Sequence, residues 1–368
     1  MTDLIEVGKD HFASNRFYEA ENVFREAEKK GNRRGTLWLG TLYEWKGEYE
    51  KAYDHCLRGP DSDHRAALLC RITKHHGDWR EAERAALGQL DSKHGNEVRF
   101  ELARLYDAHR VYDKAWRHIT VANSREKASQ PKFQHILSGK WEAGKPSQSQ
   151  ESPIFVLGLP RTGTTMVERM LATHPDTTPV GEFERTGNML KAIPQFWDNM
   201  GDLDHAAKVW HTGLERRVLD KMPFNFTRVA FIRGMFPQAK IVHMTRNWRD
   251  VLVSLFFRNF ELKTDDYAWA YSLDTIKHMI RAHNAVMTMW SGPVLNIPYE
   301  GMVQDPGFWV PVMQEFCELS PSDGWRNFHR DRNLHAYSYE EVRKPLYDTS
   351  IDRWRNYYEL DKEAFLCL

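Results

Sequence analysis

The stretch Phe155-Val-Leu-Gly-Leu-Pro160-Arg161-Thr162-Gly163-Thr164-Thr165 decides the fold, because it joins a strand, a turn and the start of a helix. The apolar run Ile154–Leu159 is typical of a buried strand, and Pro160 and Gly163 mark a turn. A loop of this kind points backbone N–H groups and the positive end of a helix at an anion. We therefore predict an anion site formed by Arg161, Thr162, Gly163, Thr164 and Thr165.

This loop differs from the P-loop of nucleoside triphosphatases at one position. Gly158 and Gly163 have the P-loop spacing, but Thr164 stands where a lysine binds the β- and γ-phosphates of a triphosphate. Arg161 supplies a cation from within the loop instead. Because the chain also lacks a clear set of carboxylates for Mg²⁺, an ATP-dependent kinase is the weakest of the enzymatic alternatives.

Strands and helices alternate after the loop. The patterns predict helices over Thr164–Thr173 and Trp248–Phe257, and strands over Lys240–Thr245 and Val294–Ile297. This alternation predicts an α/β domain with a central parallel sheet and a ligand at the carboxyl ends of the strands.

A second anion site is predicted where the strand 240–245 meets the following helix. Arg246 closes the strand, and Ser254 and Arg258 are one helical turn apart on the expected helix. Two anion sites at two such turns fit a nucleotide that carries two phosphate groups.

The first third of the chain repeats a pattern in which an aromatic residue precedes an alanine by three positions. The four segments are Arg16–Ala20, Gly47–Ala52, Gly77–Ala82 and Arg110–Ala115. The alanines are 32, 30 and 33 residues apart, close to the 34-residue tetratricopeptide period. We predict a tetratricopeptide-like array of helical hairpins, although the spacing is irregular and the usual proline after the second helix is mostly missing. An unrelated helical bundle is the alternative.

Composition divides the chain into an array over 1–139, a polar linker over 140–152 and an α/β domain over 153–368. With 51 basic and 51 acidic residues, 41% hydrophobic and 28% charged residues, the chain is globular and has no global field for nucleic acid. The four cysteines show neither zinc-site nor disulfide spacing. The sequence shows no signal peptide and no membrane span, which predicts a cytoplasmic protein.

The two anion motifs resemble those of the sulfotransferases. Pro160–Thr165 is similar to their 5′-phosphosulfate loop, and Arg246 with Ser254 is similar to their 3′-phosphate site. The resemblance spans roughly residues 153–357 and is closest to bacterial tetratricopeptide-containing sulfotransferases and to tyrosylprotein sulfotransferases. It implies a P-loop-like sulfotransferase domain that uses 3′-phosphoadenosine 5′-phosphosulfate (PAPS) as co-substrate. Since positioned cations suffice for a sulfuryl group, we expect no metal.

The resemblance also implies catalytic residues. Glu182 matches the catalytic glutamate of tyrosylprotein sulfotransferases and would be the base, with Glu184 and His174 as rivals. We interpret His174 mainly as a helix C-terminal residue beside Pro175. Lys221 matches the lysine that contacts the leaving oxygen.

Further site residues follow from the same resemblance. Arg161 would contact the sulfate and the 5′-phosphate, Ser338 would lie near the sulfuryl group, and Tyr299 would lie against the nucleotide. Arg353, 15 residues after Ser338, would contact the nucleotide. The family often has lysine there, so Arg353 keeps the charge but changes the geometry.

The acceptor is open at this stage. Glu182 favours a phenolic hydroxyl such as a peptide tyrosine, whose pKa near 10 calls for a base. A small molecule, lipid or glycan acceptor is the alternative within the same chemistry. The array could bind a peptide or protein acceptor, dock a synthase or form a homodimer. A repeat adaptor that only binds the nucleotide is the non-enzymatic alternative, and Glu182, Lys221 and Ser338 beside intact phosphate motifs argue against it.

Overall fold

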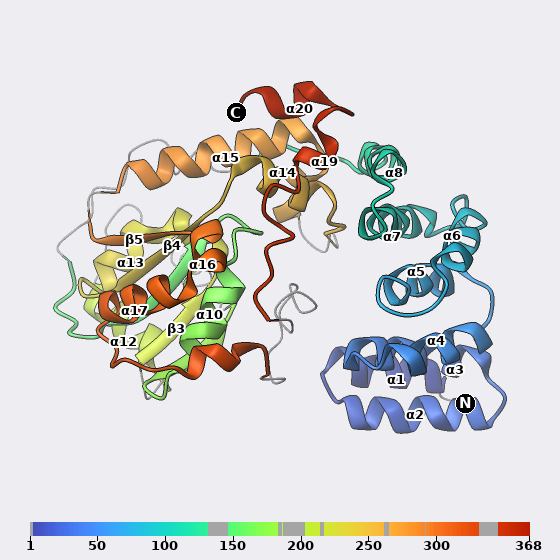
Figure 1. Ribbon diagram of the computed structural model, residues 1–368. Coiled ribbons are helices and arrows are strands. Elements are labelled where there is room, and N and C mark those ends of the chain that lie inside the picture. The colour runs from blue at the N-terminus through green and yellow to red at the C-terminus, as the bar shows by residue number, and fades with distance from the viewer. Residues whose placement is uncertain are drawn as a thin grey trace. The chain divides into compact units, whose positions relative to one another are not determined.

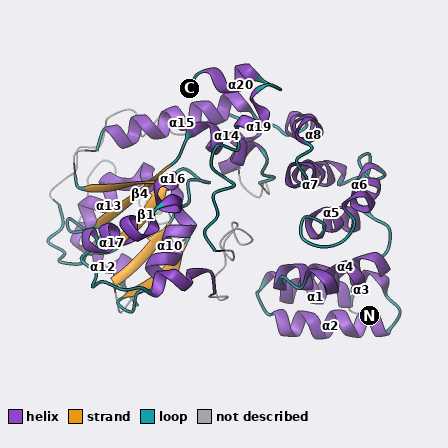
Figure 2. Ribbon diagram, in the orientation of Figure 1, coloured by secondary structure: helices purple, strands orange, loops and turns teal. Residues whose placement is uncertain are grey.

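The computed structural model describes residues 3–131, 146–182, 186, 203–213, 217–260, 265–290, 292–330 and 345–368 (Figures 1 and 2). The chain forms two compact units. The first comprises residues 1–128, 256–272 and 356–362, and the second comprises 129–255, 273–355 and 363–368. Within the described ranges, no helix has the length and apolar character needed to cross a bilayer.

The first unit begins with a series of helical hairpins. Its helices are α1 (Leu4–Ala13), α2 (Phe17–Lys29), α3 (Arg33–Lys46), α4 (Tyr49–Arg58), α5 (Asp63–Ile72), α6 (Trp79–Leu87), α7 (Gly95–Ala108) and α8 (Tyr112–Ser124). In each hairpin, one residue between the first and the second helix has a positive φ. These residues are Asn15, Gly47, Gly77 and Arg110. A left-handed residue ends a helix and reverses the chain, so the sequence repeat is a repeat of this turn. The helical array is present as predicted, and its tetratricopeptide character stays a prediction.

The repeated alanines and aromatic residues have distinct roles in the hairpins. Ala20, Ala52, Ala82 and Ala115 are fully buried, which lets neighbouring helices approach closely. The aromatic rings three positions earlier stack on the first helix of the following hairpin or just beyond its end. Phe17 stacks on Trp45, Tyr49 on His75 and Trp79 on His109.

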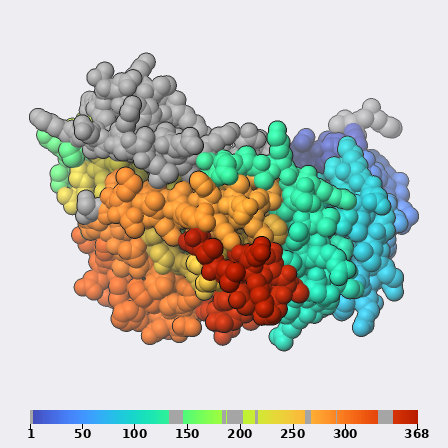
Figure 3. Space-filling model, turned by 90° about the horizontal axis from the view of Figure 1, so that it is seen from above, coloured from blue at the N-terminus to red at the C-terminus, as the bar shows by residue number. Residues whose placement is uncertain are grey.

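Two segments from the second half of the chain pack on the last hairpin. Trp116 of α8 contacts the rings of Phe256 and Tyr357, and the hydroxyl of Tyr357 donates a hydrogen bond to Asp107. Tyr357 belongs to the short helix α19 (Arg355–Tyr358). Residues 356–362, part of the red surface in Figure 3, lie beside the teal residues of α7 and α8.

The second unit is built on a parallel sheet of five described strands in the order β2-β3-β1-β4-β5. The strands are β1 (Ile154–Gly158), β2 (Thr177–Gly181), β3 (Arg217–Lys221), β4 (Lys240–Thr245) and β5 (Val294–Pro298). The parallel sheet confirms the predicted fold class. β4 has the predicted bounds, whereas β2 and β3 were not predicted.

Helices cover both faces of this sheet (Figure 2). Phe155 of β1 packs on one face with α12 (Leu203–His211) and α13 (Val229–Met235). Ile154 and Val156 point to the other face, as strand alternation requires. The helices on that second face are α10 (Thr164–Ala172), α16 (Tyr299–Gln304), α17 (Pro306–Phe316) and the 3-10 helix η4 (Gly324–Arg330).

The remaining helices include α14 (Trp248–Phe256), α15 (Leu273–Thr288) and α20 (Lys362–Leu366), with 3-10 helices η2 (Pro223–Arg228) and η3 (Asp265–Tyr271). α14 ends at Phe256, and the amide of Asn123 donates a 2.9 Å hydrogen bond to the Phe256 carbonyl. The Asn123 side chain thus satisfies a carbonyl that would accept an intrahelical hydrogen bond if the helix continued. Arg258 therefore lies beyond the helix, and the prediction that it shares a helical face with Ser254 was wrong.

Candidate active site

The predicted anion-binding loop, residues 159–163, connects β1 to α10, and we call it the phosphate-type loop. Arg161 has φ 75° and Gly163 has φ 97°, so two left-handed residues fold the loop around the helix start. Gly163 is the N-cap and has no side chain to cap α10, which leaves the first helical N–H groups for a ligand. The hydroxyl of Thr162 instead donates a 2.7 Å hydrogen bond to the Leu159 carbonyl and holds the loop.

Close packing also fixes glycine at position 163. A Cβ atom there would lie 2.7 Å from Cδ2 of Tyr299, closer than real Cβ atoms approach other heavy atoms. The positive φ adds strain for any other residue. Tyr299 thus packs on the loop as well as on Arg246, whose guanidinium carbon lies 4.3 Å from the ring centroid.

The two predicted anion motifs meet. Nε of Arg161 donates a 2.9 Å hydrogen bond to Oγ of Ser254 on α14, and Arg246 donates through one terminal nitrogen to the Arg161 carbonyl at 2.9 Å. The other terminal nitrogen of Arg246 donates to the Ser350 carbonyl at 2.6 Å. Parallel strands β1 and β4 are neighbours, so the loops at their carboxyl ends lie side by side.

These groups line one cavity in the second unit. The predicted residues along its wall are Arg161, Gly163, Thr164, Thr165, Arg246, Ser254, Tyr299 and Arg353. Residues that sequence analysis missed complete the wall, namely Met166, Val303, Phe328, Pro345, Leu346, Tyr347 and Ser350. The wall therefore combines cations and hydroxyls with an apolar surface that suits a nucleobase or another aromatic ring.

A buried carboxylate holds the C-terminal part of this wall. Asp250, in the first turn of α14, accepts hydrogen bonds from the backbone N–H groups of Asp352 at 2.8 Å and Trp354 at 2.9 Å. These bonds fix the turn that carries Ser350 and Arg353. Burial raises the pKa of Asp250. No sequence pattern predicts this contact, because its partners are backbone groups about a hundred residues away.

The predicted base and lysine also contact each other. Nζ of Lys221, the last residue of β3, lies 2.6 Å from Oε1 of Glu182, which follows β2. Oε2 of Glu168 on α10 lies 3.8 Å from the same nitrogen. Glu168 was not predicted. Burial, with a smaller contribution from the charge of Glu182, outweighs the effect of Lys221 and raises the pKa of Glu168 to about 7.

Several predicted or rival residues are not in the cavity wall. Glu182, Lys221, Thr162 and His174 are described by the structure but are not among the residues that line the cavity. Ser338 and Glu184 lie outside the described residues. Arg258 falls in the segment that clusters with the helical array, and it is not among the cavity residues. Their roles stay predictions.

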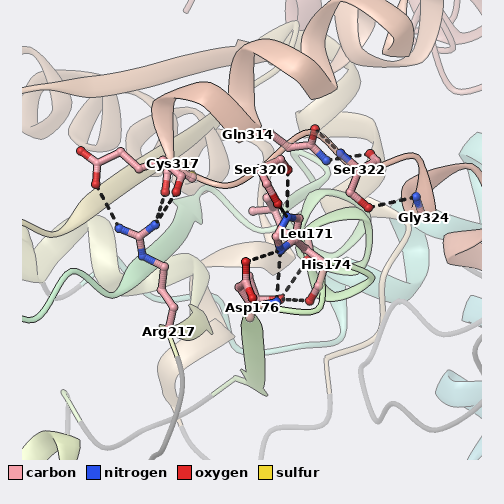
Figure 4. A network of polar contacts seen from close by, with 11 residues as sticks. Leu171, His174, Asp176, Arg217, Gln314, Cys317, Ser320, Ser322 and Gly324 are labelled. Atoms are coloured by element: carbon pink, nitrogen blue, oxygen red, sulfur yellow. Dashed lines mark hydrogen bonds and ion pairs between the residues drawn. The ribbon is translucent and has the colours of Figure 1, made fainter.

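His174 is held in a structural network (Figure 4). Its Nε2 lies 2.9 Å from the carbonyl oxygen of Ser320, to which it donates, and its Nδ1 accepts from the backbone N–H of Asp176 at 3.2 Å. The ring is buried just beyond the end of α10. Because both ring nitrogens are engaged, this geometry does not fit a base that receives a proton from an acceptor.

Comparisons with known proteins show which family this domain is similar to. Residues 153–211 and 203–323 match the sulfotransferase family. An uncharacterized protein of Aquifex aeolicus is 29% identical over 306 residues, which cover 70% of this chain and 39% of that protein. Protein-tyrosine sulfotransferase 1 of Danio rerio is 25% identical over 198 residues, 46% of this chain and 54% of that enzyme. The sulfotransferase domain of the Synechococcus PCC 7002 olefin synthase is 18% identical, with a TM-score of 0.42, and covers 58% of this chain and 91% of that domain.

The chain therefore carries a sulfotransferase-family domain, homologous to the protein-tyrosine sulfotransferases. It spans between about two fifths and about half of the lengths of these two relatives.

Proposed function

We propose that this protein moves the sulfuryl group of PAPS to an acceptor hydroxyl, with a peptide tyrosine or another phenol as the preferred acceptor. The observation that carries the proposal is the meeting of two anion motifs in one cavity. Arg161 precedes α10, Arg246 directly follows β4, and Ser254 lies on α14; all three line the same cavity. That arrangement suits a nucleotide with anionic groups on both its 5′ and 3′ sides.

Binding of the nucleotide follows from the wall of the cavity. The open N-terminus of α10 and Arg161 would hold the 5′-phosphosulfate, and Arg246 with Ser254 would hold the 3′-phosphate. Burial lowers the pKa of Arg246. An anion beside this buried cation would offset its desolvation, so the cavity favours an anionic ligand. Tyr299 offers an aromatic face and Arg353 a further cation.

The reaction forms a bond between the acceptor oxygen and sulfur and breaks the bond between sulfur and the bridging oxygen of the 5′-phosphate. The electron pair of the broken bond stays on that oxygen, where Lys221 would stabilise the charge. Glu182 would take the proton of the acceptor hydroxyl. Sulfated acceptor and 3′,5′-adenosine bisphosphate are the products.

A phenolic acceptor is consistent with a carboxylate as the catalytic base and with the activity for which a matched relative is named. A phenol has a pKa of about 10, so a carboxylate that begins to take its proton as the bond to sulfur forms raises its nucleophilicity. One of the matched relatives, from Danio rerio, is named as a protein-tyrosine sulfotransferase. The cations of the site supply the charge stabilisation, and we propose that no metal is required.

The test is transfer of radioactive sulfate from PAPS to three candidates: a tyrosine peptide, the same peptide with phenylalanine, and para-nitrophenol. We expect label in the tyrosine peptide or in para-nitrophenol and none in the phenylalanine peptide. Glu182→Gln should lower the transfer rate by about 100-fold or more while the affinity for 3′,5′-adenosine bisphosphate stays within about twofold. Wild-type turnover in this variant would overturn the assignment of the base.

Glu318→Gln is the matched control. Glu318 also pairs with a lysine of the sheet, because its Oε1 lies 2.5 Å from Nζ of Lys240. Lys240 is the first residue of β4, so that pair lies at the amino end of the strand, whereas the cavity lies beyond its carboxyl end at Arg246. Its loss should leave transfer unchanged. Equal losses of activity in both variants would show that the Glu182 effect is not specific to the site.

A further inference from the structure

Lys221 has two carboxylate neighbours that differ in exposure. The lysine side chain is 1% exposed, Glu182 is 32% exposed and Glu168 is 4% exposed. Glu182 can therefore turn toward solvent and an acceptor, whereas Glu168 is enclosed by the protein. The reaction proposed above requires this movement, since Glu182 in the structure is bound to Lys221 at 2.6 Å.

A buried ammonium cannot be left alone when Glu182 moves. Removing one partner of a buried ion pair costs several kcal/mol, because the remaining charge has no compensation. Glu168 is the other carboxylate within ion-pair distance of Lys221 among the residues that the structure describes. Its Oε1 is buried and has no hydrogen-bond partner in the same set of residues. The carboxylate thus has acceptor capacity in reserve.

The position of Glu168 links the lysine to the phosphate-type loop. Glu168 lies one turn after Thr164, which begins α10 and lines the cavity. Lys221 ends β3, which is paired with β1, the strand that leads into the loop. An ammonium held by Glu168 therefore stays between the helix and strand that flank the 5′ side of the site.

We propose that Glu168 is a positioning residue, which takes over the Lys221 ammonium when Glu182 turns to the acceptor and keeps that ammonium beside the leaving oxygen. This inference rests on the proposed sulfuryl transfer. The electrostatics agree with it. The negative charge of Glu182 raises the pKa of Glu168, so Glu168 holds its own charge more readily once Glu182 moves away or takes a proton.

The experiment is a double-mutant cycle in the full chain, with para-nitrophenol and the tyrosine peptide as acceptors. The variants are Glu168→Gln, Lys221→Ala and the double variant, with Glu318→Gln as the matched control. We expect Glu168→Gln to lower kcat by about 10- to 100-fold and to change KM for the acceptor by less than about twofold. In the Lys221→Ala background the same change should cost less than about twofold, because Glu168 acts through Lys221.

The outcomes separate the two proposals. Wild-type kcat in Glu168→Gln, or an equal loss with and without Lys221, would overturn the role of Glu168 and leave the sulfotransferase proposal intact. Absence of both 3′,5′-adenosine bisphosphate binding and transfer in the wild-type protein would overturn the proposed function, and this inference with it. If Glu168→Gln does not fold, Glu168→Asp enters the same cycle, since it withdraws the carboxylate from Lys221 but keeps its charge.

Discussion

Nε of Arg161 donates a 2.9 Å hydrogen bond to Oγ of Ser254, a residue 93 positions away on another βα unit. The bond ties the loop after β1 to the helix after β4. Each of these elements carries one of the two anion motifs found in the sequence. The contact joins two separate motifs into one binding site.

Replacing Arg246 with alanine should weaken nucleotide binding on the 3′ side. A charged hydrogen-bond donor contributes about 1.5 to 3 kcal/mol, so we expect the affinity for 3′,5′-adenosine bisphosphate to fall by about 10- to 100-fold. Adenosine 5′-monophosphate lacks the 3′-phosphate, and its affinity should change by less than about threefold. Calorimetric titration measures both. Similar losses for the two ligands would mean that Arg246 supports the fold rather than the phosphate.

Replacing Gly163 with alanine should damage the loop. The new Cβ would meet Tyr299 at 2.7 Å and the residue would keep φ near 97°. We expect a loss of about 1 to 3 kcal/mol in unfolding free energy and at least about tenfold in affinity for 3′,5′-adenosine bisphosphate. Gly213→Ala is the control, because Gly213 has φ 79° and a Cβ there would meet no atom of the described residues within 4 Å. That variant should show the backbone strain and bind the nucleotide normally; an equal loss of affinity there would contradict the role of the Gly163–Tyr299 contact.

Replacing Asp250 with alanine should loosen the turn that holds Arg353. Two backbone N–H groups, of Asp352 and Trp354, would lose their acceptor. We expect affinity for 3′,5′-adenosine bisphosphate to fall by about tenfold, since the C-terminal wall of the cavity would no longer be fixed. Asp305→Ala removes a carboxylate that caps α17 at the Phe308 N–H and serves as the control. Unchanged binding in Asp250→Ala would show that the turn does not contribute to the site.

The charge of Glu168 should destabilise the protein as the pH rises. Burial raises the pKa of Glu168 from its ordinary value of 4.5 to about 7, and the charged groups that act on it are Lys221, Glu182 and Arg169. The folded state binds more protons between these two values, so this group's contribution to stability is present below pH 4.5 and is lost as the pH rises to about 7. The cost is a few kcal/mol at most.

Thermal unfolding measures this cost. Glu168→Gln cannot ionise at this position, so its unfolding temperature relative to wild type should rise between pH 5 and pH 8. A difference that stays constant over this range would contradict the raised pKa. A rise, together with the expected loss of kcat, would mean that the carboxylate is kept for activity at a cost in stability.

Much of the fold could be predicted because its signals are local. The helix after the loop, the strand over 240–245 and the four repeated hairpin turns each show in a short window of sequence. β2 and β3 could not be predicted in that way. β2 contains Pro179, which an edge strand tolerates, and β3 has three charged residues in five positions, two of them buried in the structure.

The site was predictable where a motif carries the chemistry, and not where distant contacts create it. Arg161, Arg246, Ser254, Tyr299 and Arg353 meet in one cavity as the resemblance implied. The sequence could not show that Asp250 fixes the C-terminal turn or that Glu168 approaches Lys221, because tertiary packing alone creates those contacts. The end of α14 was misjudged for the same reason, since Asn123 lies far away in the sequence.

Calorimetric titration with 3′,5′-adenosine bisphosphate and with ATP, both in EDTA, tests whether the cavity is a PAPS site. We predict tight binding of the bisphosphate without metal and much weaker binding of ATP, because the loop has Arg161 within it and Thr164 in place of the P-loop lysine. Preference for ATP, or binding of the bisphosphate only after Mg²⁺ is added, would mean that the cavity is not a PAPS site.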